Sequence, residues 1–434
     1  METAFDLTTP IVRSRLEPDF YKFTMGQLIW QKYRNVETTF TFSNRTARAR
    51  LGRVLDVGEL REQFDHARSL MFTDVELAYL GGIGNYQQRM FGDGYLEFLR
   101  ELRLPGYHVE SRGDQLVLEF SGPWAEVSYW ETMALSIVSE VYHRTLLRTL
   151  SESERKTIFA EGVGRLQKKI AVLREHPQIT FSDFGTRRRF SGPWQHYVDH
   201  TLEDELNHGS SRTQFLGTSN TFEAMVNGIA PTGTSAHELP MILAGILDDG
   251  SEDPAWLRRA QRQVIDDWWE QYGVGLAIFL PDTWGTDFFF SVVTADDLRR
   301  WKGFRWDSGD LFEFGERVIR AYQETGIDPG EKMLIASDAL DLDVILRAQK
   351  HFSERIRISY GWGTGLTNDL LDGVMIDDRW FGPMSLVIKP TQANGRSLVK
   401  LSDNPAKAIG PTPDVDRYRR IAGYHDHPAV MPKY

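Results

Sequence analysis

The chain has 434 residues, and its 41% hydrophobic content is ample material for a large core. This length exceeds what one small core needs and suits a barrel of about 250 residues with an additional domain. The net charge of −11 argues against non-specific nucleic-acid binding, and the lack of cysteine excludes disulfides, thiolate metal sites and cysteine nucleophiles.

The first part of the chain is expected to mix strands and helices. β-Branched and aromatic residues predict strands over 36–42 and 114–120. Helical stretches are expected between these strands, at 58–72 and 74–91. The sequence therefore predicts an α+β region over about residues 1–125.

Two long helices, expected at 129–150 and 151–175, precede a series of short apolar strands. Most of these strands pass into a polar or glycine-rich turn and then a helix, as at 311–322. The expected strands are 178–185, 214–220, 275–285, 303–310, 332–341 and 357–365. Repeated strand-then-helix units predict a parallel sheet, either open or closed into a barrel.

Polar or small residues stand at the C-terminal ends of these strands. They are Asp183, Thr218, Ser219, Asp282, Asp307, Asp338, Gly363 and Thr364. In a barrel the C-terminal strand ends meet on one face, and the active site is built there. We therefore expect these residues, although far apart in sequence, to contribute to one pocket.

The last part of the chain returns to a strand-like pattern over 385–403. Asn394-Gly395 stands between two apolar alternating runs, which is a strong hairpin signal. We expect this hairpin to pack on the first region. The predicted organisation is an α+β domain of residues 1–125 joined by 380–434, and an α/β-barrel domain of residues 126–379.

Two motifs suggest anion binding, each with a structural alternative. Phe184 precedes an arginine run that begins at Arg187, and arginine offers a rigid fork of donors that suits a carboxylate or phosphate. The alternative, which this motif alone slightly favours, is a basic loop over a core phenylalanine. Glycines at 361, 363 and 365 follow a strand and would let backbone N–H groups approach a phosphate. The alternative there is a flexible turn.

Three acid–base candidates also have structural alternatives. Asp307 and Asp338 could accept hydrogen bonds from ribose hydroxyls or hold magnesium through water, but aspartate at such positions also caps helices. Arg305 points to the same side of its strand as Asp307. His237, with an acidic residue after it, could act as acid, base or phosphate acceptor. A surface or structural role is the better reading of this histidine taken alone.

Together these motifs make the chain resemble the nicotinate phosphoribosyltransferase family, in its bacterial type. The matching segments, in the family's order, are 19–25 (DFYKFTM), 131–140 (ETMALSIVSE), 181–191 (FSDFGTRRRFS), 216–224 (LGTSNTFEA), 231–238 (PTGTSAHE), 305–310 (RWDSGD), 336–343 (ASDALDLD), 361–369 (GWGTGLTND) and 387–403 (VIKPTQANGRSLVKLSD). Two details depart from the pattern. Gly365 replaces a larger polar residue, and the arginine run after Thr186 is longer than needed.

The resemblance implies an irregular α/β (TIM-like) barrel with a discontinuous α+β domain, in a homodimer with shared active sites. It implies that nicotinate and 5-phosphoribosyl-1-diphosphate react, with ATP as co-substrate and Mg²⁺ as cofactor. The pyridine ring would lie between Phe184 and Tyr21 of the partner subunit, and His237 would be a phosphohistidine. The other implied site residues are Arg187 and Arg305 for anionic groups, Asp307 and Asp338 for the ribose hydroxyls, Gly363 and Thr364 for the 5-phosphate, and Thr218, Ser219 and Asp282 in the substrate site.

One residue distinguishes this chain from the nearest alternative, a nicotinamide phosphoribosyltransferase. Ser219 occupies the place where nicotinamide-using relatives carry an aspartate, which would repel a carboxylate. We expect the serine hydroxyl to donate a hydrogen bond to nicotinate. A barrel aldolase needs a strand-end lysine that the expected strands lack, and a sugar-phosphate-binding protein is a third alternative. Because no membrane span or secretory signal is found, we expect a cytoplasmic protein without membrane or nucleic-acid partners.

Overall fold

The computed structural model describes residues 7–86, 88–210, 212–371, 373–376, 378–425 and 428–429. The ends of the predicted α+β domain, at 1–6 and 430–434, therefore lie outside the described residues. Among the residues described, no helix is long and apolar enough to cross a membrane. One continuous hydrophobic cluster runs through the described part of the chain, and the predicted domain boundaries stay a prediction.

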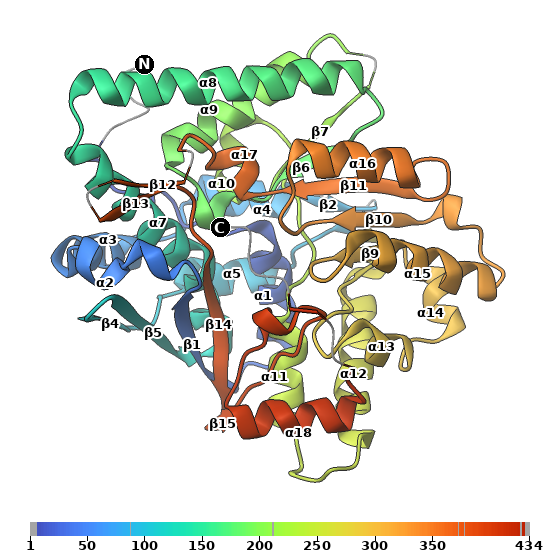
Figure 1. Cartoon of the computed structure of the whole chain (residues 1–434). Helices are drawn as coiled ribbons and strands as arrows, with labels where there is room; N and C mark the ends of the chain where they lie inside the picture. The colour runs from blue at the N-terminus through green and yellow to red at the C-terminus, as the bar shows by residue number, and fades with distance from the viewer. Residues whose placement is uncertain are drawn as a thin grey trace.

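A five-stranded antiparallel sheet joins both parts of the chain, in the order β15-β14-β1-β5-β4. Its strands are β1 (Glu37–Asn44), β4 (Tyr107–Arg112), β5 (Gln115–Pro123), β14 (Leu386–Ala393) and β15 (Arg396–Ser397). The late strand β14 lies beside the early strand β1 (Figure 1). The predicted hairpin is confirmed, and Asn394 and Gly395 have φ angles of 47° and 78°, as an Asn-Gly turn requires.

The helices of the first region surround this sheet. They are α1 (Phe20–Lys32), α2 (Leu51–Val54), α3 (Val57–Ser69), α4 (Asp74–Gly82), α5 (Asp93–Glu101) and α6 (Trp124–Val127). The helix predicted over 74–91 was too long, because α4 ends at Gly82 and a small hairpin of β2 (Gly84–Asn85) and β3 (Gln88–Arg89) follows. Gly81, Gly82 and Gly84 lie close together where the helix ends. Because each glycine destabilises a helix by about 1 kcal/mol relative to alanine, these residues disfavour its continuation.

The two predicted long helices are present as α7 (Trp130–Arg148) and α8 (Glu152–Glu175). Nearly every residue of α7 is buried, because it packs between the antiparallel sheet and the site segments. Helix α8 runs along one edge of the molecule, at the top of Figure 1. The hydroxyl of Ser151 accepts from the backbone of Glu154 while the Glu154 side chain accepts in return, and this capping box starts the helix.

A six-stranded parallel sheet forms the second layer, in the order β7-β6-β11-β10-β9-β8. Its strands are β6 (Phe181–Asp183), β7 (Phe215–Thr218), β8 (Ile278–Phe279), β9 (Gly303–Trp306), β10 (Met333–Ala336) and β11 (Arg357–Trp362). The predicted parallel sheet is thus confirmed. The first strand β6 pairs with the last strand β11, as in a barrel. Within the described residues no ladder joins β7 to β8, so closure stays a prediction.

Helices alternate with these strands and cover the sheet, and α15 and α16 lie beside β9, β10 and β11 (Figure 1). The remaining elements are α9 (Gly192–Leu202), α10 (Thr221–Asn227), α11 (Glu238–Leu247), α12 (Ala255–Tyr272), α13 (Thr286–Phe290), α14 (Ala295–Arg300), α15 (Leu311–Glu324), α16 (Leu342–Phe352), α17 (Thr364–Thr367), β12 (Val374–Ile376), β13 (Arg379–Phe381) and α18 (Thr412–Ala422). The alternation places the loops after the strands on one side of the sheet.

Candidate active site

A cavity of about 240 Å³ opens at the C-terminal ends of the parallel strands. Ten of the predicted site residues line it: Tyr21, Phe184, Arg187, Ser219, His237, Arg305, Asp307, Asp338, Gly363 and Thr364. Tyr21 comes from α1, and the others lie at or after the C-terminal ends of the parallel strands or in the segment before α11. The parallel arrangement of the strands brings these strand ends together.

Three residues expected in the pocket, Asp183, Thr218 and Asp282, do not line the cavity. Thr218 is fully buried, and its hydroxyl donates to Asp183 Oδ2 at 2.9 Å. Asp282 is 2% exposed and accepts a hydrogen bond of 2.6 Å from Ser308 Oγ. These three side chains are therefore buried behind the residues that line the cavity.

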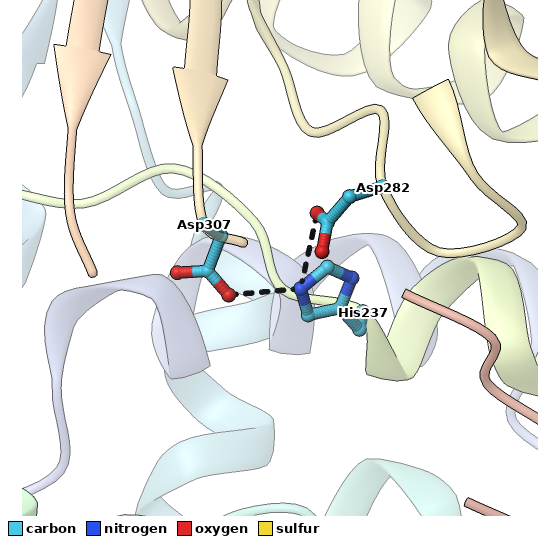
Figure 2. Close-up of side chains that lie close together, drawn as sticks. All are labelled: His237, Asp282 and Asp307. Carbon is cyan, nitrogen blue, oxygen red and sulfur yellow. Dashed lines mark hydrogen bonds and ion pairs between the residues drawn. The ribbon is translucent and has the colours of Figure 1, made fainter. Parts of the chain in front are cut away.

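Two carboxylates lie near one ring nitrogen of His237 (Figure 2), and a hydroxyl lies near the other. Its Nε2 lies 3.0 Å from Asp307 Oδ2 and 3.5 Å from Asp282 Oδ1, and its Nδ1 lies 2.9 Å from Thr283 Oγ1. Burial lowers the pKa of His237 to about 4, so the imidazole is neutral at pH 7. Because a carboxylate only accepts, these partners assign the proton to Nε2 and a lone pair to Nδ1.

The carboxylates beside His237 suit a magnesium ion. Ligand atoms of His237, Asp282 and Asp307 all lie within 4.8 Å of one another. Asp282 Oδ1 is buried, and no hydrogen-bond partner for it is found in the part of the chain that the structure describes. Burial acts to raise the pKa of Asp307, but the hydrogen bond from His237 and the charge of Arg305 hold this pKa well below its usual value. Two ionised carboxylates are the ligands that Mg²⁺ prefers.

Two aromatic residues, Phe184 and Tyr21, also line the cavity. The Phe184 ring lies against Gly361, where a Cβ atom would come within 2.3 Å of the ring, so only glycine fits. This chain's own Tyr21 also lines the cavity, and its hydroxyl donates to Glu131 Oε2 at 3.2 Å. Tyr21 reaches the cavity because α1 packs on the parallel-sheet region of its own chain, where Phe20 N donates to Ser219 O at 2.7 Å. The contribution of this tyrosine by a partner subunit stays a prediction.

Ser219 lines the cavity, but its hydroxyl already has a partner. It donates to Asp19 Oδ1 at 2.9 Å, and Asp19 lines the same wall. A hydrogen bond from this hydroxyl to a bound carboxylate stays a prediction, because its single proton is directed at Asp19 in the structure. Burial raises the pKa of Asp19 above its usual value, against the opposing hydrogen bond with Thr186 and the charge of Arg187.

The arginine run divides between two roles. Arg187 and Arg188 line the cavity, and Arg188 Nε is fixed by a 3.0 Å hydrogen bond to Leu386 O. Arg189 is fully buried away from the cavity and pairs with Glu17 at 2.8 Å. Thus the third arginine stabilises the fold, and the first two add positive charge to the site.

Sequence reasoning missed four cationic residues of the cavity, Arg45, Lys389, Lys400 and Lys407. They come from the β1 side and the C-terminal segment rather than from the ends of the parallel strands. Lys407 Nζ lies 2.7 Å from Asp338 Oδ2, and Lys400 Nζ lies 3.5 Å from Asp282 Oδ2. The matching segment 387–403 contained the signal for two of them, since Lys389 and Lys400 lie in it.

The cavity is basic in an acidic protein. Four arginines and three lysines line it, against three aspartates, whereas the whole chain has a net charge of −11. Such a cavity attracts a ligand with several anionic groups. The aromatic residues suit a flat ring, the aspartates suit hydroxyls or a cation, and the neutral histidine can act as a nucleophile.

Comparisons with known proteins match most of the chain to one family. The model of the nicotinate phosphoribosyltransferase (NAPRTase) family matches residues 179–426, and the model of the NAPRTase N-terminal domain matches residues 16–139. A nicotinate phosphoribosyltransferase from Vibrio cholerae is 29% identical, with a TM-score of 0.82 over 97% of this chain and 96% of that one. A nicotinate phosphoribosyltransferase from Porphyromonas gingivalis is 28% identical, with a TM-score of 0.78 over 95% and 100%.

Proposed function

Because this chain belongs to the nicotinate phosphoribosyltransferase family, we propose that it joins nicotinate to 5-phosphoribosyl-1-diphosphate. The products are nicotinate mononucleotide and diphosphate, a step of NAD biosynthesis. The observation that carries this proposal is the composition of one cavity, where aromatic residues accompany an excess of cationic side chains and two strand-end aspartates.

The charge of the cavity suits the sugar substrate. 5-Phosphoribosyl-1-diphosphate carries a phosphate at one end and a diphosphate at the other, so it needs cations at both ends. The glycine-rich turn with Gly363 and Thr364 offers backbone N–H groups for the 5-phosphate. Lys400 and Lys407 lie near Asp282 and Asp338, on the side of the cavity that suits the diphosphate.

The reaction depends on the charge that develops on the ribose. As the bond from the anomeric carbon to the diphosphate oxygen breaks, the ring gains positive oxocarbenium character. Carboxylates of Asp307 and Asp338 stabilise this charge and accept hydrogen bonds from the hydroxyls. The pyridine nitrogen then forms the new bond to the anomeric carbon, and the Phe184 wall holds the pyridine ring in line.

Magnesium and ATP complete the proposal. Asp282 and Asp307 would hold Mg²⁺, which supplies neutralisation of phosphate charge when bound. His237, neutral at pH 7, would attack the γ-phosphorus of ATP through its lone pair. The N–P bond forms as the bond to the bridging oxygen breaks and ADP leaves. Asp307, which accepts from Nε2–H, stabilises the positive charge on the ring. An ATP-dependent ligase classification follows from this step.

The alternative base is nicotinamide, and two observations disfavour it. Arg187 lines the cavity near Asp19 and offers a donor fork that suits the nicotinate carboxylate. Ser219 adds no negative charge at the position where nicotinamide-using relatives carry an aspartate. The proposed enzyme is therefore selective for nicotinate over nicotinamide.

Product formation and labelling of His237 test the proposal together. Labelled nicotinate should yield the mononucleotide, and γ-labelled ATP should leave an acid-labile label on the protein. The variant His237→Asn should keep a slow ATP-independent turnover, lose stimulation by ATP and take no label. Equal labelling of wild type and variant would assign the phosphate to another residue, and a lack of mononucleotide would remove the proposed reaction.

A further inference from the structure

Helix α1 holds the segment that presents His237. Thr24 Oγ1 donates to Thr234 O at 2.7 Å, and the backbone N–H of Ala236 points at Met25 Sδ at 3.3 Å. Lys22, one turn earlier on α1, forms an ion pair with Glu238, the residue that follows His237. The same helix therefore touches the histidine segment before and after the histidine itself.

Lys22 is the centre of a buried group of charges. Its Nζ lies 2.6 Å from Glu131 Oε2 and also contacts Glu238 Oε2, and the three side chains are at most 1% exposed. Glu238 Oε1 accepts from Trp124 Nε1 at 2.7 Å. Burial alone would lower the pKa of Lys22, but the two carboxylates raise it above its usual value, so the ammonium stays charged.

The same group of charges reaches the cavity through Glu131. Glu131 Oε2 accepts from the Tyr21 hydroxyl at 3.2 Å, and Glu131 Oε1 lies 2.8 Å from Lys389 Nζ. Tyr21 and Lys389 both line the cavity. The Lys22 ammonium thus connects Glu131, which holds two cavity residues, with Glu238, the residue that follows the histidine in the chain.

We propose that Lys22 and Glu238 are positioning residues that transmit the phosphorylation state of His237 to the substrate-binding side chains Tyr21 and Lys389. This inference rests on the proposed ATP-dependent function. A phosphoryl group adds nearly two negative charges, and here it would appear on the buried residue that directly precedes Glu238 in the chain. Buried charges interact strongly, so a change at Glu238 alters the ion pair between Lys22 and Glu131. Because Glu131 also binds Tyr21 and Lys389, the positions of these two side chains change with it. Substrate affinity then depends on whether the histidine is phosphorylated.

The variant Glu238→Gln tests the link directly. Glutamine keeps the size of the side chain and an acceptor for Trp124, removes the charge, and leaves Lys22 paired with Glu131. Coupling between two sites in proteins typically changes affinity by about 5–150-fold. In the wild type we expect ATP to lower the Michaelis constants for the two substrates by at least about fivefold. The variant should still take the acid-labile label on His237, lose this ATP effect, and hydrolyse more ATP per mononucleotide formed.

The matched control is Glu270→Gln, because α1 also carries Lys32, which pairs with Glu270 at an exposed position away from the cavity. This control should keep the wild-type ratio of ATP hydrolysed to product. If Glu238→Gln does not fold, the double variant Lys22→Met with Glu238→Gln removes one ammonium and one carboxylate together. It leaves Glu131 paired with Lys389, and the same expectations apply.

The outcomes separate this inference from the proposed function. A wild type without label and without an ATP effect overturns the ATP step and this inference with it. A wild type that shows both, with a folded Glu238→Gln variant that keeps the full ATP effect, overturns only the inference. Loss of the label in Glu238→Gln also overturns it, because Glu238 would then support phosphorylation itself.

Discussion

The hydroxyl of Ser219 donates a 2.9 Å hydrogen bond to the carboxylate of Asp19, and both side chains line the same cavity wall. Ser219, which we propose distinguishes the two pyridine substrates, therefore already donates its hydroxyl proton within the protein. Asp19 also feels the positive charge of Arg187, which balances a negative charge at this wall. A carboxylate ligand at this wall would lie near Asp19. The Asp19 carboxylate already has the Ser219 hydroxyl as a hydrogen-bond donor and Arg187 as a nearby cation.

Ser219→Asp should change the preferred base. The new carboxylate would lie against Asp19 and the nicotinate carboxylate, and two unit charges about 4 Å apart repel by about 4 kcal/mol at an effective dielectric of 20. This corresponds to about three powers of ten in affinity. We expect the Michaelis constant for nicotinate to rise far more than that for nicotinamide. Ser219→Asn, which adds no charge, is the control, and an unchanged ratio in Ser219→Asp would place selectivity elsewhere.

Gly363→Glu should abolish measurable activity. A Cβ atom at this position would lie 3.1 Å from Phe184 O, and the carboxylate would extend into the space assigned to the 5-phosphate. We expect a loss of two to three orders of magnitude, since like charges about 4 Å apart repel by about 4 kcal/mol. Gly164→Glu is the matched control, because a Cβ atom added at that exposed helical position would meet no other segment within 4 Å. A folded Gly363→Glu enzyme with normal apparent affinity for the sugar substrate would contradict the assignment.

Mixing two inactive variants tells whether one chain contains a complete site. Tyr21→Ala and Phe184→Ala each remove one aromatic residue of the cavity. Both residues come from the same chain in the structure. When the two variants are mixed and refolded together, so that their subunits can exchange, we therefore expect no restored activity. A site shared between subunits, as the family resemblance first suggested, would instead give mixed dimers with one intact site and restored turnover.

Stability should depend on pH through the buried His143, which lies outside the cavity. Burial lowers the pKa of His143 to about 4, from an ordinary value of 6.5. Between these values the unfolded chain binds a proton that the folded chain excludes, so the unfolding free energy rises with pH across this window. The contribution is about 3 kcal/mol in total, since one pKa unit corresponds to about 1.4 kcal/mol.

The measurement compares wild type with His143→Leu by denaturant unfolding at several pH values. Burial raises the pKa of Asp183 to about 6, which gives a slope of opposite sign, so the difference between the two proteins is the readout. The variant should show a smaller rise in the unfolding free energy between pH 4 and 6.5. Equal slopes in both proteins would show that the pKa of His143 is the same in the folded and the unfolded chain.

Local patterns predicted the elements and most of the strand-end residues. Asn394-Gly395 predicts its turn because few other residues adopt its backbone conformation, and a residue such as Asp307 follows from its place directly after a strand. The helix predicted at 74–91 failed because the apolar pattern continues past Gly81 and Gly82, where the helix ends. Helical periodicity does not reveal such a stop by itself.

Contacts between distant segments could not be predicted in the same way. Lys407 reaches Asp338 only because the C-terminal segment folds over the parallel strands, and no local pattern encodes that approach. The pairing of Ser219 with Asp19 likewise depends on how α1 docks on its own chain. A sequence motif gives the residue type at a site, whereas the chain that supplies it and its hydrogen-bond partners follow from packing.

Diphosphate release from 5-phosphoribosyl-1-diphosphate tests the proposed reaction most directly. It is measured on the purified full chain with ATP and magnesium, in the presence of nicotinate, of nicotinamide, or of no base. Rapid release with nicotinate, with little release in the other two reactions, is the predicted result. Release that is equally fast without a base, or with nicotinamide in place of nicotinate, would contradict the proposal.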